Sequence, residues 1–518
     1  MRNAARFVGA LYAVTLLSLI PSGTALAAKE CARAVDGIDL QTATIPQMQA
    51  AMDAGDLTSV DLVKAYLARI AAFDTGGSLK LNAIRTLAPD AIQQAAKADA
   101  SREEGDHRPL LGIPVLLKDN VSTFDMPTTA GSIGLEGAQP NRDATIAKKL
   151  RAAGAIILGK TNLSEFANWV SLNAANGWSS LGGRVKNAYT STPTTIGDPS
   201  GSSSGSGVAA SMAFAAATIG TETSGSILSP TDANGDAGVK TTMGLASRAG
   251  ILPLSPSFDV PGPITRNITD AAVILNAIAG PDPDDSATAG SQTSNYVRAL
   301  HAGALEGTHL AYSQDAHDAL SSAEQTLFDA GLARLRKLGA TVTAVNALGA
   351  QDVGITELGF IPNEFKASLN AYLADYEPNA KSHNLDDIYA YAQAHADKYP
   401  YGMDLLQASD AMPGRAELYP AAISVQSAAK ADIDAALAEG NAEAIVTPGP
   451  AHANIGAAAG YPTVETQLGY LGKTPADIGF MGRPYSEAKL LSYAYDFEQD
   501  AHVRKLPQEL NTSLSGSC

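Results

Sequence analysis

The chain has 518 residues, 45% of them hydrophobic, and a formal net charge of −17 at pH 7. This length and composition allow a large buried core, and no linker or internal repeat divides the sequence, so we expect one large domain. The acidic balance lacks the clustered Lys and Arg that phosphate contacts require, which excludes nucleic acid as an expected partner.

Residues 1–27 have the pattern of a secretory signal peptide. Arg2 and Arg6 precede an apolar segment, and small residues up to Ala27 supply a cleavage site. The apolar segment is too short to span a bilayer comfortably, and no later segment is long and apolar enough to do so. We therefore expect a mature chain of residues 28–518 that is exported to the periplasm or secreted, with no membrane partner after the signal is removed.

Two cysteines, Cys31 and Cys518, lie near the two ends of this mature chain. In an oxidising compartment their placement suggests a disulfide that ties the termini together, and the alternative is two unpaired thiols. Neither cysteine has the context of a catalytic thiol, and the eight histidines show no metal-ligand spacing. We therefore predict no metal and no cofactor.

Helices and strands alternate along the first part of the mature chain. In chain order we predict helices at 46–54 and 60–73, a strand near 81–87, a helix at 89–104, a strand that ends at Lys118, a helix near 144–153 and a strand at 155–158. This alternation is typical of an α/β fold in which helices cover both faces of a sheet.

Two turns rich in small residues, at 201–207 and 220–226, enclose an apolar run from Val208 to Ile219. The run is rich in alanine and contains neither Gly nor Pro, so we expect it to form a single buried helix. Glycine-rich turns leave backbone N–H groups free, and such groups can hold a negatively charged oxygen that develops during a reaction.

Two other interpretations fit parts of this segment. A flexible Ser/Gly linker would have similar turns, but it would not enclose an apolar run of this length. An esterase elbow of the GxSxG type fits Gly201, Ser203 and Gly205, and it would make Ser203 the nucleophile. That elbow requires an apolar strand before the serine, which the sequence does not supply, and a base, for which His452 or His502 would have to serve.

Three motifs together resemble those of the amidase signature family. GTETSGSILSP resembles the family's nucleophile turn and places the nucleophile at Ser226, and SGSSSGS resembles the turn of its bridging serine, here Ser202. GIPVLLKDN resembles the segment that carries the family's lysine base, here Lys118. The resemblance is dense over about 110–285 and weak over about 285–440, where we expect substrate specificity to lie. It implies a single large domain with a mixed sheet between layers of helices.

The resemblance implies a serine hydrolase mechanism in which a proton passes from Ser226 through Ser202 to Lys118. It also implies an oxyanion hole formed by the backbone N–H groups of Thr223, Ser224, Gly225 and Ser226. A lysine acts as the base only when it is neutral. Because Lys118 follows an apolar run that is expected to be an interior strand, we expect burial to lower the pKa of its amino group.

Departures from the family pattern bear on the substrate. Glu222 stands where the family usually has Asp, Ser224 replaces a glycine, and Leu228 replaces a frequent Arg. The changes at Glu222 and Leu228 resemble the branch whose exported members remove ammonia from C-terminal peptide amides. Among small-molecule and peptide amides, we therefore expect the C-terminal amide of a peptide as the substrate, with release of ammonia, and the resemblance assigns no oligomeric state. The alternatives are an amidase of simple aliphatic or aryl amides and a catalytically silent exported binding protein.

Two further expectations concern residues outside these motifs. We expect Asp259 and Arg266 to form an ion pair that supports the site. Aromatic residues between Phe360 and Tyr401 are candidates for the wall of an apolar substrate pocket, and packing in the core explains them equally well.

Overall fold

The computed structural model describes residues 33–346, 348, 360–414 and 419–514. The segment expected to be a signal peptide lies outside these residues, as do Cys31 and Cys518, so export and the disulfide remain predictions. Within the described part of the chain, no helix is long and apolar enough to cross a membrane.

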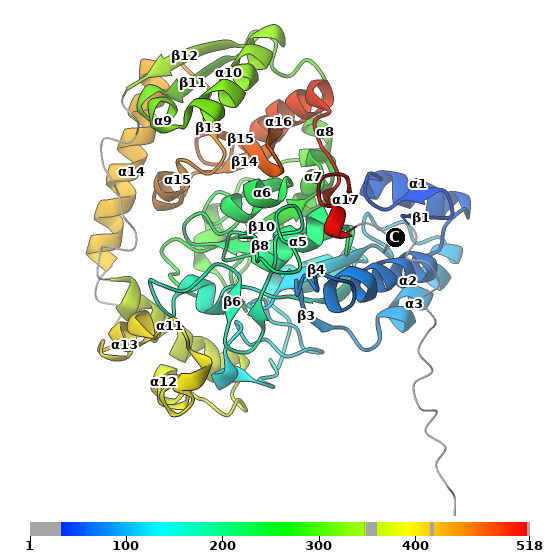
Figure 1. Cartoon of the computed structure of the whole chain (residues 1–518), viewed down its shortest axis with the longest axis vertical. Coiled ribbons are helices and arrows are strands. Elements are labelled where there is room, and N and C mark those ends of the chain that lie inside the picture. The colour runs from blue at the N-terminus through cyan, green and yellow to red at the C-terminus, as the bar shows by residue number, and fades with distance from the viewer. Residues whose placement is uncertain (1–32, 347, 349–359, 415–418, 515–518) are drawn as a thin grey trace, which may run out of the picture.

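A mixed sheet of eleven strands runs through the molecule (Figure 1). Its order is β12 (Thr341–Val345), β11 (His309–Ser313), β13 (Ala444–Pro448), β15 (Thr474–Met481), β14 (Thr463–Leu471), β9 (Ala237–Lys240), β10 (Val260–Thr265), β8 (Ala217–Glu222), β4 (Pro114–Lys118), β5 (Ile156–Thr161) and β3 (Ile84–Leu87). The pairs β11–β12, β11–β13, β4–β5 and β4–β8 are parallel, and the remaining neighbours are antiparallel. The predicted fold class, a single α/β domain with a mixed sheet between helices, is confirmed.

Helices cover the sheet, and two small hairpins lie outside it. The helices are α1 (Ile45–Ala54), α2 (Ser59–Arg69), α3 (Ala91–Glu103), α4 (Thr145–Ala152), α5 (Ser204–Ser211), α6 (Leu228–Asn234), α7 (Ile268–Ile278), α8 (Tyr296–Ala299), α9 (Gln314–Ala319), α10 (Ser322–Lys337), α11 (Ile361–Tyr376), α12 (Leu385–Ala394), α13 (Asp404–Asp410), α14 (Tyr419–Glu439), α15 (Ala453–Ala459), α16 (Glu487–Ala501) and α17 (Pro507–Leu510). The hairpins are β1 (Ala34–Val35) with β2 (Ile38–Asp39), and β6 (Trp178–Ser179) with β7 (Gly183–Arg184).

The elements predicted in the first part of the chain agree with the structure to within a few residues. Thr44 caps α1 and forms a capping box with Gln47, and the Thr58 side chain caps α2. After Arg69 the helix continues as a π-helix to Thr75, which explains why the helical pattern extends past the end of α2.

The prediction of one helix over residues 208–219 is wrong. The helix α5 ends at Ser211, and strand β8 begins at Ala217. Between them the chain reverses direction at Ala213, which has a φ of 51°, and the Phe214 N–H donates to the Ala209 carbonyl. Both halves of the run are fully buried, and a buried strand flanked by helices has the same apolar composition as a buried helix.

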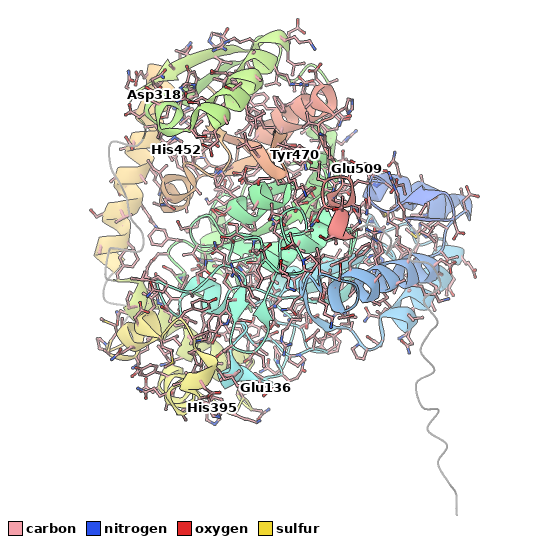
Figure 2. All side chains as sticks on the ribbon, viewed as in Figure 1. Glu136, Asp318, His395, His452, Tyr470 and Glu509 are labelled. Atoms are coloured by element: carbon pink, nitrogen blue, oxygen red, sulfur yellow. The ribbon has the colours of Figure 1, made fainter. Side chains whose placement is uncertain are left out.

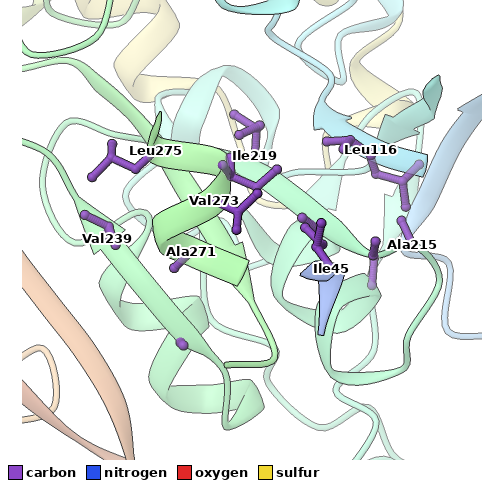
Figure 3. Packing of buried hydrophobic residues seen from close by; sticks show 14 of the residues in the cluster. Ile45, Leu116, Ala215, Ile219, Val239, Ala271, Val273 and Leu275 are labelled. Atoms are coloured by element: carbon purple, nitrogen blue, oxygen red, sulfur yellow. The ribbon is translucent and has the colours of Figure 1, made fainter. Parts of the chain in front are cut away.

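The core on one face of the sheet forms between α7 and the central strands. Figure 3 shows Val273 of α7 close to Ile219 of β8. Leu275 of α7, Leu116 of β4 and Val239 of β9 belong to the same apolar cluster. On the other face, α5 packs against β8 and β10, and α6 packs against β9, β14 and β15. The two serine-rich turns lie at the starts of α5 and α6, so this packing fixes both turns against one sheet.

The expected ion pair between Asp259 and Arg266 does not form. Asp259 accepts a hydrogen bond from the Thr223 hydroxyl, and the Arg266 Nη1 atom donates to the Ala215 carbonyl. The two residues flank the six-residue strand β10 at opposite ends. An extended strand of that length separates them by roughly 20 Å, which no ion pair can bridge.

Buried carboxyl groups lie where α6 packs on the sheet. Glu465 of β14 is fully buried, and neither of its side-chain oxygens has a hydrogen-bond partner. Burial raises the pKa of Glu465 well above its usual range, and the neighbouring Asp232 and Glu222 raise it further. Burial therefore favours the protonated, uncharged form of Glu465 in the folded protein.

Replacing Glu465 with Gln should make the protein more stable at alkaline pH. In the unfolded chain a glutamate ionises at about pH 4.3, whereas burial holds the pKa of Glu465 well above this in the folded chain. The wild type therefore loses stability as the pH rises from the unfolded pKa towards the folded one. We expect E465Q to resemble the wild type near pH 4 and to exceed its free energy of unfolding by roughly 1 kcal/mol or more at pH 8.

Urea denaturation at both pH values measures this difference. The exposed Glu136, labelled in Figure 2, provides the matched control, because Glu136→Gln should produce no pH-dependent gain. A gain for E465Q that is the same at pH 4 and pH 8 would show that Glu465 is not held in its protonated form.

Candidate active site

Lys118 lies at the end of β4, a central strand that pairs with β5 on one side and β8 on the other. Its side chain is fully buried. The Nζ atom donates to Ser202 Oγ at 2.8 Å, to Thr221 Oγ1 at 3.0 Å and to the Thr221 carbonyl at 3.2 Å. All three acceptors are neutral oxygens, so the amino group has hydrogen-bond partners without an ion pair among them.

Burial lowers the pKa of Lys118 to about 7. Asp259 and Glu222 oppose this shift through their charges, but the loss of water around the ammonium group has the larger effect. A pKa this low makes the neutral form of Lys118 accessible near neutral pH. A neutral amino group that touches a serine hydroxyl can accept its proton.

Ser202 reaches Lys118 from the turn that precedes α5. The Gly201–Ser202 peptide bond is cis, and Ser200 has a φ of 58°. The Ser202 carbonyl accepts a hydrogen bond from the Ser164 N–H at 3.1 Å. Ser202 is fully buried.

The turn that carries Ser226 follows directly after β8 and leads into α6. The buried Glu222, the last residue of β8, accepts hydrogen bonds at one oxygen from the N–H groups of Ile227 at 2.8 Å and Leu228 at 3.0 Å. Gly225 has a φ of 75°, a conformation that residues with a side chain rarely adopt. Glu222, which stands where the family usually has Asp, thus stabilises the turn through the backbone that follows Ser226.

Two side chains of the turn are tied to neighbouring segments. The Thr223 hydroxyl donates to Asp259 at 2.5 Å, and Asp259 also accepts from the N–H groups of Leu254 and Ser255 at 2.9 Å. The Ser224 hydroxyl donates to Asn454 at 2.6 Å. These two hydrogen bonds fix the side chains on both sides of the Thr223–Ser224 peptide and so hold the turn in place.

The two serine turns meet through the backbone. The Ser203 N–H donates to the Ser226 carbonyl at 3.2 Å, which places the residue after Ser202 in contact with the predicted nucleophile. The structure thus brings Lys118 and Ser202 into contact through their side chains, and it joins the Ser226 turn to them through Ser203. The predicted oxyanion residues Thr223, Ser224 and Gly225 belong to this same turn.

The requirements of an esterase elbow at Ser203 are not met in the described residues. No strand lies between Arg184 at the end of β7 and Ser204 at the start of α5. The Ser203 hydroxyl is buried against β8, where it donates to the Thr221 carbonyl at 3.1 Å and accepts from the Thr221 N–H at 3.2 Å. Ser203 therefore supports the strand that carries the site.

The two histidines that an esterase would need lie in other environments. His452 precedes α15 (Figure 2), its Nε2 atom is buried without a hydrogen-bond partner, and burial lowers its pKa to about 4. His502 is exposed at the end of α16. Among the described residues, no group of three or more His, Cys, Asp or Glu side chains is arranged to hold a metal ion.

A cavity of about 350 Å³ adjoins the site. Asn120, Thr221, Thr223 and Asp259 line its inner end. Its apolar wall comes from the loop at 249–254, from Phe166 and from α11, which contributes Tyr372 and Tyr376. The charged residues Arg248, Asp284, Asp285 and Asp375 also line the cavity. The expectation that aromatic residues beyond Phe360 line a pocket is thus confirmed for these two tyrosines.

Sequence analysis missed two residues that shape the site, Asn120 and Asn454, and gave a third, Asp259, the wrong partner. Asn120 donates to Thr221 Oγ1 at 3.0 Å, Asp259 holds Thr223, and Asn454 holds Ser224. Asn120 stands two residues after Lys118 in the GIPVLLKDN motif, which is a signal that sequence analysis could have used. Asp259 and Asn454 contact the turn from distant segments, so no local pattern reveals them.

Comparisons with known proteins identify the family of this chain. The family model named Amidase matches residues 61–479. A protein of Arabidopsis thaliana named "Probable amidase" is 36% identical over 489 residues, which cover 90% of this chain and 92% of that protein. Since the family model spans most of the chain, the chain belongs to the amidase signature family, and it is an amidase.

Solved structures place the chain near one branch of that family. The peptide amidase of Stenotrophomonas maltophilia is 38% identical with a TM-score of 0.84, and the match covers 90% of this chain and 98% of that chain. A structure of the peptide amidase PAM in complex with the competitive inhibitor chymostatin is 38% identical with a TM-score of 0.85, covering 91% of this chain and 100% of that chain.

Removing the Thr223 hydroxyl should impair amide hydrolysis by loosening the turn. Thr223→Val keeps the shape of the side chain but deprives Asp259 of a hydrogen-bond donor. We expect kcat/KM to fall by about tenfold, while Thr223→Ser, which keeps the hydroxyl, should remain near the wild-type value. Steady-state kinetics on a single amide substrate provides the comparison. Equal values for the Val and Ser variants would mean that this hydrogen bond does not position the turn.

Proposed function

We propose that the protein hydrolyses the C-terminal carboxamide of peptides and releases ammonia through an acyl-enzyme at Ser226. The observation that carries this proposal is the 2.8 Å hydrogen bond between the buried Lys118 amino group and Ser202, beside the turn of Ser226. A lysine with a pKa of about 7 supplies the base that an otherwise unreactive serine hydroxyl requires.

Formation of the acyl-enzyme requires two proton transfers before the bond to the substrate forms. Neutral Lys118 takes the proton of Ser202, Ser202 takes the proton of Ser226, and the Ser226 oxygen forms a bond to the amide carbon. The carbonyl oxygen becomes negatively charged and accepts hydrogen bonds from the backbone of residues 223–226. The C–N bond then breaks as the relay returns a proton to the nitrogen, and ammonia leaves.

A water molecule completes the cycle. It adds to the ester carbon of the acyl-enzyme and gives one proton to the relay, which returns that proton to Ser226 as the serine leaves. The products are a free carboxylic acid and ammonia, and the enzyme is unchanged. The described side chains supply every proton transfer, with Lys118 as the base in both halves of the reaction.

The peptide amide is favoured over a simple amide by the neighbouring cavity. A volume of about 350 Å³ with largely apolar walls is in the range of pockets that hold a ligand much larger than acetamide. The likeness to peptide amidases at 38% identity supports the same choice. Simple aliphatic or aryl amides would occupy only the part of the cavity near Thr221 and Thr223.

Ammonia release from a substrate panel tests this proposal. The panel contains C-terminally amidated dipeptides, acetamide and benzamide. We expect the amidated dipeptides to have the highest kcat/KM, and we expect Ser226→Ala to lower kcat by about 10³ or more.

Two control variants separate the proposed mechanism from the esterase alternative. Ser203→Ala and His452→Ala should each retain activity within about tenfold of the wild type, since neither residue transfers a proton in our scheme. Activity that survives Ser226→Ala and is lost in Ser203→Ala would overturn the mechanism. A folded protein that releases ammonia from none of the amides would favour the silent binding protein.

A further inference from the structure

The cavity beside the Ser226 turn opens to solvent between charged side chains. In addition to its apolar wall, it is lined by Arg248, Asp259, Asp284, Asp285 and Asp375. Asp284 and Asp375 are exposed, whereas Asp285 is buried. The two exposed carboxylates therefore mark the opening of the cavity, which we call its mouth.

Three of these five charged residues already have strong partners. Arg248 donates two hydrogen bonds to the carboxylate of Asp285, from Nε at 2.9 Å and from Nη2 at 2.6 Å, so the charges of this pair cancel. Asp259 accepts hydrogen bonds at both carboxylate oxygens, from the Thr223 hydroxyl and from two backbone N–H groups. None of the three is left to bind a charged substrate.

Among the described residues, no side chain balances the charge of Asp284. Its carboxylate has neither a hydrogen bond nor an ion pair there, and only its backbone N–H is engaged, by Asp282 at 3.0 Å. The other exposed carboxylate, Asp375, pairs with Arg142 at 2.5 Å. Asp284 therefore gives the mouth, as the described residues define it, a net negative charge.

Tyr376 connects the mouth to the apolar wall. Its ring stacks with that of Tyr372, with centroids 5.5 Å apart and planes 5° apart, and the guanidinium carbon of Arg142 lies 3.8 Å from its centroid. Burial raises the pKa of Tyr376, Arg142 lowers it, and the charges of Asp375 and Asp284 raise it. Both carboxylates thus act on the outer end of a wall formed by two aromatic rings.

We propose that the enzyme accepts peptides whose amidated C-terminal residue is Lys or Arg and discriminates against acidic residues there, with Asp284 as the residue that sets this specificity. Lys and Arg have an apolar stem and a charged head. The stem packs along the Tyr372 and Tyr376 rings, and the head lies at the mouth beside Asp284. An acidic side chain in the same place is repelled by Asp284.

The C-terminal residue is the part of the substrate that can reach from the reaction to the mouth. Its side chain is attached one atom away from the scissile carbonyl, and Thr223 of the catalytic turn lines the same cavity as Asp284. A long side chain that starts near Thr223 can therefore end near Asp284. This inference rests on the proposed function, because it assumes that a peptide amide occupies the cavity.

Three N-acetylated dipeptide amides test the proposal, with glycine first and lysine, norleucine or glutamic acid as the amidated residue. We expect the wild type to hydrolyse the lysine peptide with a kcat/KM at least about tenfold above that of the glutamate peptide. About 0.5 M NaCl should reduce this ratio, because salt screens charges at an exposed mouth. Ammonia release measures all three rates on the unaltered protein.

Asp284→Asn removes the charge and keeps the shape of the side chain. Because Asp284 is exposed and its carboxylate holds no other described residue, we expect the variant to fold. The ratio of the lysine rate to the glutamate rate should fall by about threefold or more, and the norleucine rate should stay unchanged. Asp284→Lys should favour the glutamate peptide. Asp56→Asn, in an exposed turn after α1, is the matched control and should keep the wild-type ratio.

The norleucine peptide separates the two proposals, since its hydrolysis requires the amidase reaction and no charge recognition. Release of ammonia from none of the three peptides would overturn the proposed function and this inference with it. Hydrolysis of the norleucine peptide together with equal rates on the lysine and glutamate peptides would overturn this inference alone. So would a folded Asp284→Asn variant that keeps the wild-type ratio.

Discussion

The burial of the Lys118 amino group is the constraint on which the rest of the site depends. An ion pair would hold this lysine in its charged form, in which it cannot accept a proton. Glu222 and Asp259 are the carboxyl groups whose charges act on the pKa of Lys118. Both instead accept hydrogen bonds from backbone N–H groups, Glu222 in the Ser226 turn and Asp259 in the loop at 254–255. The carboxyl groups that could form an ion pair with the lysine therefore stabilise the loops around it. The lysine amino group contacts only the neutral oxygens of Ser202 and Thr221.

The sheet order explains how the two serine turns meet. Strands β4 and β8 are parallel neighbours, so Lys118 and Glu222 end at the same edge of the sheet. The helix α5 precedes β8 in the chain and packs against it. Because α5 runs back along β8, the Ser202 turn at its N-terminus lies at the same edge of the sheet as Lys118 and Glu222. At the opposite end of β8 and its antiparallel neighbour β10, the reversal of the chain after α5 is held by buried arginines. One strand pair thus has the candidate active site at one end and the reversal of the chain after α5 at the other.

Much of the fold and most of the site could be predicted because their signals are local. Lys118, Ser202 and Ser226 each lie in a short contiguous motif, and the fold class follows from alternating patterns. The run at 208–219 could not be divided correctly, because complete burial removes the periodicity that separates a helix from a strand. Asp259 contacts Thr223 from 36 residues away, and Asn454 contacts Ser224 from 230 residues away. Such contacts depend on the tertiary structure, as does the position of Asp284 at the mouth of the cavity.

The pKa of Lys118 is the quantity that tests the account of the site most directly. Labelling the lysines with ¹³C at the ε position and following their NMR shifts against pH measures it, and Lys118→Met assigns the signal. We predict a titration with a midpoint near pH 7 for this one resonance, clearly below the ordinary value for lysine. A Lys118 that remains protonated above about pH 9 would contradict the account, because the serine relay would then have no base.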